Sequence, residues 1–253
     1  MSIWQALVLG VIQGITEFFP VSSSGHLVIF QNLFGIKEPQ LAFDIFLHLG
    51  TSAAVMIFFR KDILRLFTDD RKTLFFIVAA SVPTFIIGFF FKDSIESLFG
   101  AGKMVGYMLL VTGLWLGLAA RMGRIGRSSK KDVGIADSVM IGISQGIAVI
   151  PGISRSGATI ATGMMLGVDK EKACRFSFLL SLPAVLGAAV LKARGIASGV
   201  VSQEAAQYLA GAAVAMLVGM AAIKILLELV KSDRFYLFSV YCIVAGFFAI
   251  ITL

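Results

Sequence analysis

The fold is decided by Pro20-Val21-Ser22-Ser23-Ser24-Gly25-His26, a polar stretch between two apolar segments, and by a second stretch that resembles it. The second reads Pro151-Gly152-Ile153-Ser154-Arg155-Ser156-Gly157, and its Ser-x-Ser-Gly lies 132 residues after that of the first. A Gln-Gly pair precedes each copy at the same offset. The copies differ where chemistry would differ: Glu17, Ser23 and His26 correspond to Val149, Arg155 and Ala158. We therefore interpret the chain as two related halves that have become specialised.

The composition of the 253 residues is that of a membrane protein, with 58% hydrophobic and 15% charged residues. Soluble domains have about 45–50% apolar and about 25% charged residues. Cys174 and Cys242 lie far apart in or beside apolar runs, which predicts two buried hydrophobic side chains rather than a disulfide or a metal cluster. The net charge of +7 falls mainly in the loops between apolar runs, so we expect no nucleic-acid partner.

Six apolar runs are long enough to cross a bilayer, which takes about 20 residues. Four other apolar segments are too short or are interrupted by polar residues. Chain breaks at matching places in two halves are typical of binding sites in membrane proteins built from repeats. We therefore predict an all-α integral membrane protein with six transmembrane helices, two re-entrant helical hairpins and an inverted-topology repeat. The predicted spans are Leu41–Phe59, Leu74–Phe91, Met104–Ala120, Ala173–Leu191, Tyr208–Val230 and Phe235–Leu253, and the hairpin segments are Ile3–Phe19 with Leu27–Ile36 and Val139–Ile150 with Ala158–Val168.

The domain organisation follows from this pattern. We expect a single membrane domain over residues 1–253, with a first repeat over about 1–120 and a second over about 133–253. The basic segment 121–132 joins the repeats. With hairpins that do not change sides, 15 of the 22 Lys and Arg residues fall on one side of the membrane and 5 on the other. The positive-inside rule makes the richer side cytoplasmic, so both termini and the first hairpin are predicted to face outward.

Two charged residues stand at the broken tips, Glu17 in the first half and Arg155 in the second. A charge at mid-membrane costs at least about 2.5–3.5 kcal/mol, so its presence there indicates a function. Gln13 precedes Glu17 by four residues and shares its helix face. Carboxylate and amide oxygens suit Mg²⁺ or a similar cation. The same pair also suits a general base with an orienting partner, and the residues alone leave both interpretations open.

The Ser22–Gly25 loop offers hydroxyl groups and close backbone approach, which is typical of an anion cradle at a helix N-terminus. Arg155 is suited to bidentate phosphate recognition. A serine nucleophile needs a base, and His26 or Glu17 can act as one. His48, inside a predicted span, is expected to be buried and hydrogen-bonded, or to face the same cavity. The two tips are expected to meet near mid-membrane, so that Glu17 and Arg155 belong to one site. The residues thus predict an outward-facing site in the membrane for a phosphate-bearing ligand, and they leave hydrolysis and transport both open.

These motifs resemble those of the undecaprenyl-diphosphate phosphatase family, also called the bacitracin-resistance type. The resemblance lies in Gln13-Gly-Ile-Thr-Glu17, in Pro20–His26 and in Pro151-Gly-Ile-Ser-Arg-Ser-Gly-Ala-Thr159, and it covers the whole chain in length and spacing. It implies an enzyme of the bacterial inner membrane that removes the terminal phosphate from a C55 polyprenyl diphosphate and recycles this carrier lipid for cell-wall synthesis. Many relatives have Glu where this chain has Gln13.

The resemblance also implies roles for single residues. Glu17, Ser23, His26 and Arg155 would be catalytic, with Ser23 as nucleophile, His26 as its acid/base partner and Arg155 as the diphosphate clamp. Direct attack by water activated by Glu17 or His26 is the alternative. Glu17 and Gln13 would hold a divalent cation, Mg²⁺ or Ca²⁺. Other functions left open are a transporter or flippase for a phosphorylated polyprenyl lipid, and the oligomeric state is left open between monomer and homodimer. The residues expected to bind substrate phosphate are Gln13, Ser22, Ser24, Ser154, Ser156 and Thr159.

Overall fold

The protein is a bundle of helices with no long non-helical segment in the part of the chain that the structure describes. This computed structural model describes residues 1–36, 40–91, 102–125, 131–196, 200–232 and 234–252. An isolated parallel bridge joins Lys131 to Val168. The all-helical prediction is confirmed for these residues. The helices are α1 (Ile3–Thr16), α2 (Ser23–Leu33), α3 (Leu41–Phe58), α4 (Arg60–Phe67), α5 (Arg71–Phe90), α7 (Gly102–Ile125), α8 (Ile135–Ile147), α9 (Arg155–Met165), α10 (Lys170–Ile196), α11 (Val200–Lys231) and α12 (Tyr236–Thr252).

Five helices of the described residues are long and apolar enough to cross a membrane, which makes this a multi-pass membrane protein. They correspond to five of the six predicted spans. The sixth, predicted at Phe235–Leu253, is the shorter apolar helix α12, which has 17 residues. Leu253 and residues 126–130 of the predicted linker lie outside the described residues. Helix α4 was not predicted, because its charged sequence Arg60-Lys-Asp-Ile-Leu-Arg-Leu-Phe67 was assigned to a loop.

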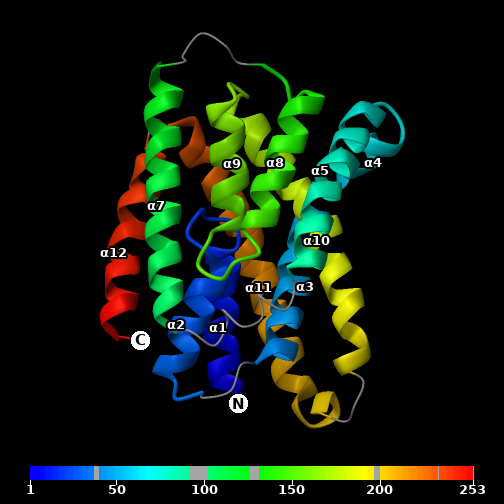
Figure 1. Cartoon of the computed structure of the whole chain (residues 1–253). Helices are drawn as coiled ribbons and strands as arrows, with labels where there is room; N and C mark the ends of the chain where they lie inside the picture. The colour runs from blue at the N-terminus through cyan, green and yellow to red at the C-terminus, as the bar shows by residue number, and fades with distance from the viewer. Residues whose placement is uncertain (37–39, 92–101, 126–130, 197–199, 233, 253) are drawn as a thin grey trace.

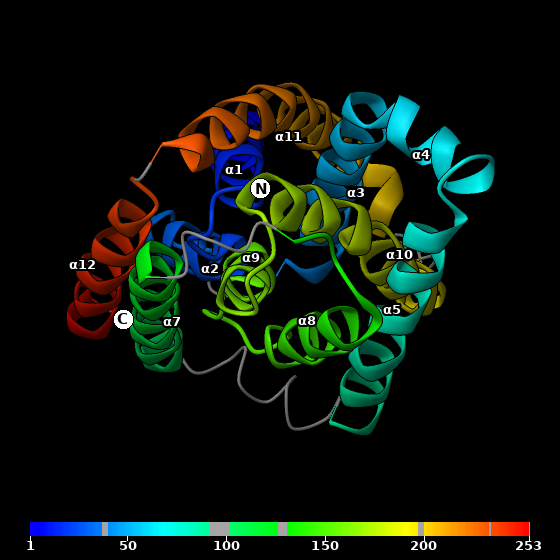
Figure 2. The ribbon, with the colours of Figure 1, turned by 90° about the horizontal axis from the view of Figure 1, so that it is seen from above.

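Two pairs of short helices lie where the broken segments were predicted. The pair α1 and α2 and the pair α8 and α9 enter the bundle from opposite ends, and the loops at their tips meet in its middle (Figure 1). The Ser156 hydroxyl of the second tip donates a hydrogen bond of 3.2 Å to the Phe19 carbonyl oxygen of the first. Seen from above, α9 lies inside the bundle and packs against α7, α8 and α10 (Figure 2). The two stretches quoted at the outset are therefore neighbours in space.

Glycines let the short helices approach the long ones closely. A Cβ atom on Gly10 of α1 would lie 2.6 Å from the Gly211 carbonyl oxygen of α11. A Cβ atom on Gly142 of α8 would lie 2.1 Å from the Ala80 carbonyl oxygen of α5. Small residues at helix contacts are typical of membrane proteins, where packing replaces the hydrophobic effect between helices. Gly10 and Gly142 are 132 residues apart, so the two halves use the same device at corresponding positions.

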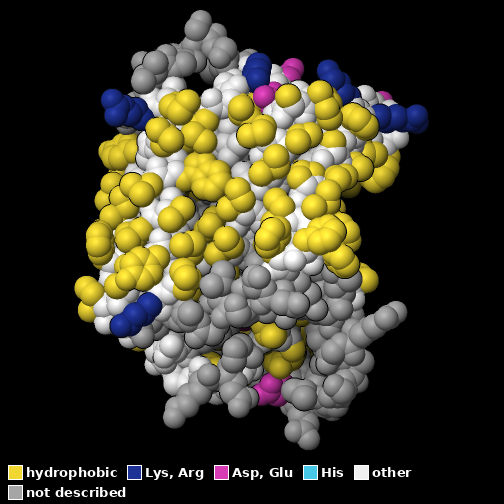
Figure 3. Space-filling model, viewed as in Figure 1, with side chains coloured by type: hydrophobic (Ala, Val, Ile, Leu, Met, Phe, Trp, Pro, Cys, Tyr) yellow, Lys and Arg dark blue, Asp and Glu magenta, His cyan; other side chains and the backbone are white. Residues whose placement is uncertain are grey.

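The outer surface has the polarity expected of a membrane domain. Hydrophobic side chains cover the middle of the face in Figure 3, and most of the Lys and Arg side chains coloured there lie across its upper end. Among large apolar residues, Leu114, Val190 and Phe90 are more than two thirds exposed. In a soluble protein such an apolar surface would be a liability, whereas in a bilayer it contacts lipid tails.

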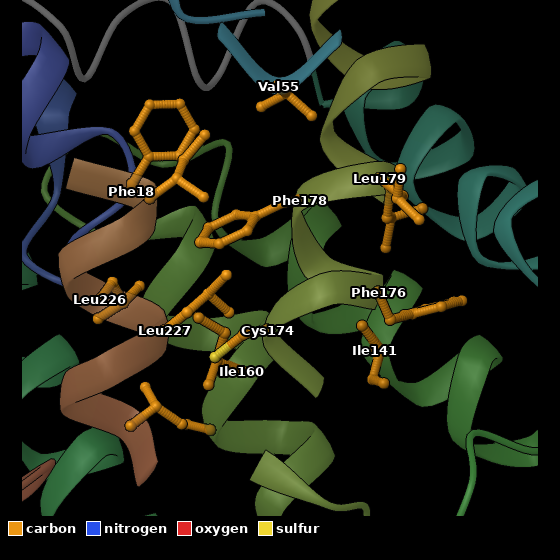
Figure 4. Packing of buried hydrophobic residues seen from close by; sticks show 14 of the residues in the cluster. Phe18, Val55, Ile141, Ile160, Cys174, Phe176, Phe178, Leu179, Leu226 and Leu227 are labelled. Atoms are coloured by element: carbon orange, nitrogen blue, oxygen red, sulfur yellow. The ribbon is translucent and has the colours of Figure 1, made fainter. Parts of the chain in front are cut away.

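The main hydrophobic core packs directly beside the tips. Phe18 follows Glu17 and meets the ring of Phe178, which follows Ser177, edge to face with centroids 5.4 Å apart (Figure 4). Both rings are fully buried. Aromatic pairs of this geometry contribute about 0.5–1.5 kcal/mol beyond the burial of their area. Because Glu17 and Ser177 are the chain neighbours of these rings, the core fixes the two backbone segments that flank the polar residues at the tips.

Candidate active site

Each tip ends in a serine that caps the helix after it. The Ser22 hydroxyl accepts a hydrogen bond of 3.3 Å from the Gly25 amide at the start of α2. The Ser154 hydroxyl accepts one of 3.0 Å from the Gly157 amide at the start of α9. Serine is a preferred N-cap because its oxygen pairs with a free amide of the first turn. Both helix N-termini lie in the middle of the bundle, where their free amides and dipoles favour an anion.

The first tip contains backbone strain. Ser22 has φ 69°, and among the described residues it is the only one other than glycine with a positive φ. Such conformations cost about 1–3 kcal/mol and cluster at functional sites. The Ser22 carbonyl oxygen accepts a hydrogen bond of 2.8 Å from His26 Nδ1, which helps to hold this conformation. The positive φ of Ser22 is part of the turn that the chain makes between Glu17 and Ser23.

Glu17 and Arg155 form an ion pair between the two tips. The Arg155 Nη2 donates to the Glu17 Oε1, and the side chains are 17% and 6% exposed. A second guanidinium nitrogen, Nη1, donates to the Ser177 carbonyl oxygen of α10 at 3.5 Å. Two opposite charges in a poorly solvated place stabilise each other, and neither would be tolerated there alone. The sequence predicted that these residues would meet, and the structure brings them together.

The other carboxylate oxygen of Glu17 collects three polar neighbours. The Ser23 hydroxyl donates to Oε2 at 2.6 Å, and Gln13 Nε2 donates to the same atom at 3.1 Å. His48 Nδ1 lies 3.3 Å from Oε2 and 3.0 Å from Gln13 Nε2. The Glu17 carboxylate therefore has a guanidinium on one oxygen and a hydroxyl on the other. A carboxylate bonded to a serine hydroxyl in this way can accept its proton.

The His26 ring makes its hydrogen bonds to partners other than the Glu17 carboxylate. Because a carbonyl oxygen only accepts, Nδ1 must carry the proton donated to Ser22. The other nitrogen, Nε2, pairs with the Tyr241 hydroxyl of α12 at 2.7 Å, and the two rings stack with centroids 5.6 Å apart. Within the described residues both ring nitrogens are thus engaged by partners other than Ser23. The structure places His26 beside the loop, and it does not bring the ring into a hydrogen bond with the expected nucleophile.

The remaining predicted hydroxyls divide into two groups. Ser24 keeps an intermediate exposure, and its hydroxyl contact with Ser22, at 3.4 Å, is weak. The hydroxyls of Ser154 and Ser156 are engaged within the tips and lie 3.3 Å apart. Thr159 is fully buried, and its hydroxyl bonds the Arg155 carbonyl at 2.8 Å and the Ser177 hydroxyl at 2.6 Å. Thr159 therefore braces the start of α9 against α10 instead of facing an open space.

The donor set for a cation consists of Glu17 and Gln13. Gln13 is fully buried, and its Oε1 has no hydrogen-bond partner in the described part of the structure. Gln145, its counterpart in the second half, shares this feature but has Val149 where Gln13 has Glu17. The described residues contain no group of three or more His, Cys, Asp or Glu that could hold a metal. The set therefore fits a hard cation that takes its other ligands from substrate phosphate and water, as Mg²⁺ commonly does.

Three neighbours of the site were not assigned to it from the sequence alone. His48 was expected to be buried or to face the cavity; it faces Glu17 and is 30% exposed. Ser177 and Tyr241 were not singled out, because each sits in a long apolar helix with no motif around it. The chain neighbours of His48, Leu47 and Leu49, gave no pattern either. Only the packing of α3, α10 and α12 around the tips brings these residues to Glu17, Arg155 and His26.

Comparison with known proteins gives matches over nearly the whole chain. The family model described as bacitracin resistance protein BacA matches residues 6–248. An undecaprenyl-diphosphatase of Desulfosudis oleivorans is 47% identical over 96% of this chain and 95% of its own length. One of Desulforapulum autotrophicum is 43% identical over 99% and 98%, and one of Methanobrevibacter smithii is 40% identical over 97% and 96%. The similarity therefore extends over nearly the full length of each of these chains.

Proposed function

Because the chain belongs to the bacitracin resistance protein BacA family, we propose that its tips form the site at which it hydrolyses undecaprenyl diphosphate to undecaprenyl phosphate and inorganic phosphate. One observation carries the assignment of the site: the Ser23 hydroxyl and the Arg155 guanidinium meet on the two oxygens of a single buried carboxylate, Glu17. In this proposal Ser23 is the nucleophile, Glu17 is its base and Arg155 is the cation that binds phosphate. In this proposal the prenyl chain stays in the bilayer beside the apolar helices, and the diphosphate group reaches the tips.

Arg155 is the residue that binds the diphosphate. It is paired with Glu17 in the structure, and a diphosphate group brings several negative charges that compete for the guanidinium. Phosphoryl transfer depends mainly on positioning and on neutralising charge at the phosphate oxygens. The amides at the N-termini of α2 and α9 add to the positive potential. When Arg155 turns to the substrate, the Glu17 carboxylate keeps its hydrogen bonds from Ser23 and Gln13.

Ser23 acts as the nucleophile with Glu17 as its base. As the Ser23 oxygen bonds to the terminal phosphorus, Glu17 takes the hydroxyl proton, the bond from phosphorus to the bridging oxygen breaks, and undecaprenyl phosphate leaves with that proton. Water then attacks the phosphoserine; Glu17 passes one water proton to the Ser23 oxygen, and inorganic phosphate leaves. The 2.6 Å contact between Ser23 and Glu17 supports this route over attack by water.

A divalent cation fits the same scheme. Glu17 and Gln13 would hold Mg²⁺ or Ca²⁺ together with substrate oxygens. When bound, the cation supplies Lewis-acid neutralisation of the phosphate charge. Ser24 is the hydroxyl available to donate to the phosphate. His26 holds the Ser22 carbonyl and so keeps the first tip in its strained shape. Ser154, Ser156 and Thr159 hold the second tip, which positions Arg155.

The topology proposed for this enzyme is an inverted repeat with two re-entrant hairpins in the bacterial inner membrane. The contact of α1 with α11 and that of α5 with α8 support it, because they exchange when the halves are exchanged at an offset of 132. By the positive-inside rule, α4 would then lie on the cytoplasmic side of the membrane and both termini on the outer side. In a chain whose native cysteines are buried, a cysteine at Asn32 should react with an impermeant maleimide from outside, and one at Asp69 only after permeabilisation. The reverse result would contradict this orientation.

Phosphate release tests the proposed function directly. Purified protein in detergent should release inorganic phosphate from undecaprenyl diphosphate, and the Glu17→Gln and Arg155→Gln variants should not. Absence of phosphate release by well-folded wild-type protein, with lipid translocation in vesicles, would favour the transport alternative. The soluble monoester p-nitrophenyl phosphate is a useful comparison, because it has neither a second phosphate group nor a prenyl chain.

A further inference from the structure

A cavity lined by charged and apolar residues lies at the end of the bundle that carries most of the basic residues. It has a volume of about 380 Å³ and is lined from both halves of the chain. Helix α4 and the first turns of α5 form one wall, and the segment before α8 and the start of α10 form the other. Figure 1 shows these elements at the upper end of the molecule, whereas the tips lie in its middle. The cavity is therefore a place separate from the Glu17–Arg155 site.

The acidic residues of the cavity already have partners. Asp62 pairs with Arg175 at 3.3 Å, Asp132 pairs with Lys172, and Asp70 accepts a hydrogen bond of 3.2 Å from the Thr73 amide. In the described structure, two cationic side chains of the lining remain without an acidic partner, Arg65 and Lys72. Lys72 Nζ instead lies 5.7 Å from the centre of the Phe76 ring. The cavity thus has two cations available for an anion.

The local potential agrees with this assignment. The hydrogen bond and charge of Lys172, together with the more distant Lys72, hold the pKa of the Asp132 carboxyl below its usual range. The exposed Asp132 is thus ionised and committed to Lys172. Over the whole lining, the cationic side chains of Arg65, Lys72, Lys172 and Arg175 outnumber the carboxylates of Asp62, Asp70 and Asp132 by one.

The walls are apolar, and the cavity adjoins the lipid-facing surface. Leu66, Phe76, Phe176 and Leu179 contribute to the lining. On α4, Leu64 and Phe67 are 68% and 62% exposed on a helix whose other positions are mostly charged. A short amphipathic helix of this kind lies at a membrane interface with its apolar side chains in the acyl boundary. A ligand in the cavity would therefore meet both a basic headgroup site and the beginning of the bilayer.

Helix α10 separates this cavity from the catalytic arginine. Phe176 and Leu179 line the cavity, whereas the Ser177 carbonyl between them accepts the hydrogen bond from Arg155 on another face of the helix. The same helix thus borders both the cavity and the tips. Two free cations, an apolar wall and a position at the interface together indicate one ligand class.

We propose that this cavity binds the phosphate headgroup of an anionic membrane lipid through Arg65 and Lys72. The lipid chemistry is a phosphate monoester or diester whose chain continues along the apolar wall into the bilayer. Undecaprenyl phosphate and phosphatidylglycerol both meet this description. The site is distinct from the hydrolytic one, and it stands or falls independently of the proposed function.

Lipid binding to the purified full-length chain in detergent tests the proposal, with native mass spectrometry as the readout. All proteins carry Arg155→Gln, so that the tips do not add a second phosphate site. The probes are undecaprenyl phosphate, phosphatidylglycerol and the zwitterionic phosphatidylethanolamine. The variant R65Q/K72Q removes both free cations. Its matched control is K61Q/R71Q, which removes the same charge from the same two helices outside the cavity lining.

The expected result is that R65Q/K72Q weakens binding of an anionic probe about tenfold or more, because it removes two charge-assisted hydrogen bonds to the phosphate. K61Q/R71Q should stay within about twofold of the parent. Binding of undecaprenyl phosphate alone would identify a site for the product, and equal binding of phosphatidylglycerol would identify a general headgroup site. Equal losses in the two double variants, no loss in either, or equal binding of phosphatidylethanolamine would overturn the proposal. The single variants R65Q and K72Q serve if the double variant unfolds.

Discussion

Arg155 and Glu17 are 138 residues apart in the chain and form a buried ion pair at the centre of the protein. Each side chain comes from a different half, and each stands where its own half has a broken helix. Neither half can place both charges, so the polar centre exists only when the tips meet. The same carboxylate accepts the Ser23 hydroxyl, which links the ion pair to the proposed chemistry.

Replacement of Ser23 by Ala should lower kcat by at least about 10²-fold, because it removes the nucleophile that Glu17 activates. Phosphate release from undecaprenyl diphosphate measures this. The matched control is Ser81→Ala, whose hydroxyl bonds the Ile77 carbonyl of its own helix and should leave kcat unchanged. A phosphorylated Ser23 should also be detectable by mass spectrometry after rapid quenching. A Ser23→Ala enzyme with near-normal turnover would instead support direct attack by water.

The ion pair should appear in a double-mutant cycle of stability. Glu17→Gln and Arg155→Gln each leave a buried charge without its partner, and each should lower the free energy of unfolding by up to about 3–5 kcal/mol. The double variant should lose less than the sum of the two, since no unpaired charge remains. Thermal unfolding in detergent, followed by a buried-cysteine reporter, measures the three variants. Strict additivity would mean that the two side chains do not interact in the folded protein.

His26 should act through the Ser22 carbonyl rather than as a proton donor to the substrate. Asn at this position retains a donor near the place of Nδ1, whereas Ala does not. His26→Asn should therefore keep a larger share of kcat than His26→Ala. Tyr241→Phe removes one hydrogen bond to Nε2 and keeps the stacked ring, so it should cost about 1 kcal/mol of stability. Equal inactivation by His26→Asn and His26→Ala would favour a proton-transfer role.

A divalent cation should be required, and its affinity should depend on Gln13. Chelation should abolish phosphate release, and added Mg²⁺ or Ca²⁺ should restore it. Gln13→Glu adds a second carboxylate beside Glu17 and should lower the cation concentration needed for half activity, and Gln13→Leu should raise it. Gln145→Glu, the corresponding change in the second half, should leave this concentration unchanged. Full phosphate release in the presence of chelator would show that Glu17 and Gln13 act in the reaction without a bound metal.

Much of the architecture could be predicted from the sequence because it depends on composition and on local breaks. Long apolar runs identify spans whatever their neighbours are, so five of the six predicted spans coincide with long apolar helices of the structure. The two Ser-x-Ser-Gly stretches were predicted as chain breaks, and they contain the N-caps Ser22 and Ser154, because a capped helix start is a local feature. Helix α4 was missed since its charges resemble those of a loop.

The site was predictable to the extent that charge in an apolar chain reveals function. Glu17 and Arg155 stood out for that reason, and they meet as predicted. The partners of the remaining residues depend on packing between distant helices. His48 reaches Glu17 from α3, and Tyr241 reaches His26 across 215 residues. Thr159 lay within a motif, yet its hydroxyl is buried against Ser177 because α9 runs through the inside of the bundle. No local pattern encodes these contacts.

The most direct test of the central claim is the rate at which Glu17→Gln releases inorganic phosphate from undecaprenyl diphosphate. This change keeps the shape of the side chain and removes only its charge and basicity. The matched variant is Glu171→Gln, whose carboxylate pairs with Arg175 and Lys231 at the end of the bundle. We predict that Glu17→Gln falls by about 10²–10⁴-fold while Glu171→Gln keeps the wild-type rate. A folded Glu17→Gln protein with the wild-type rate would contradict the assignment of the tips as the hydrolytic site.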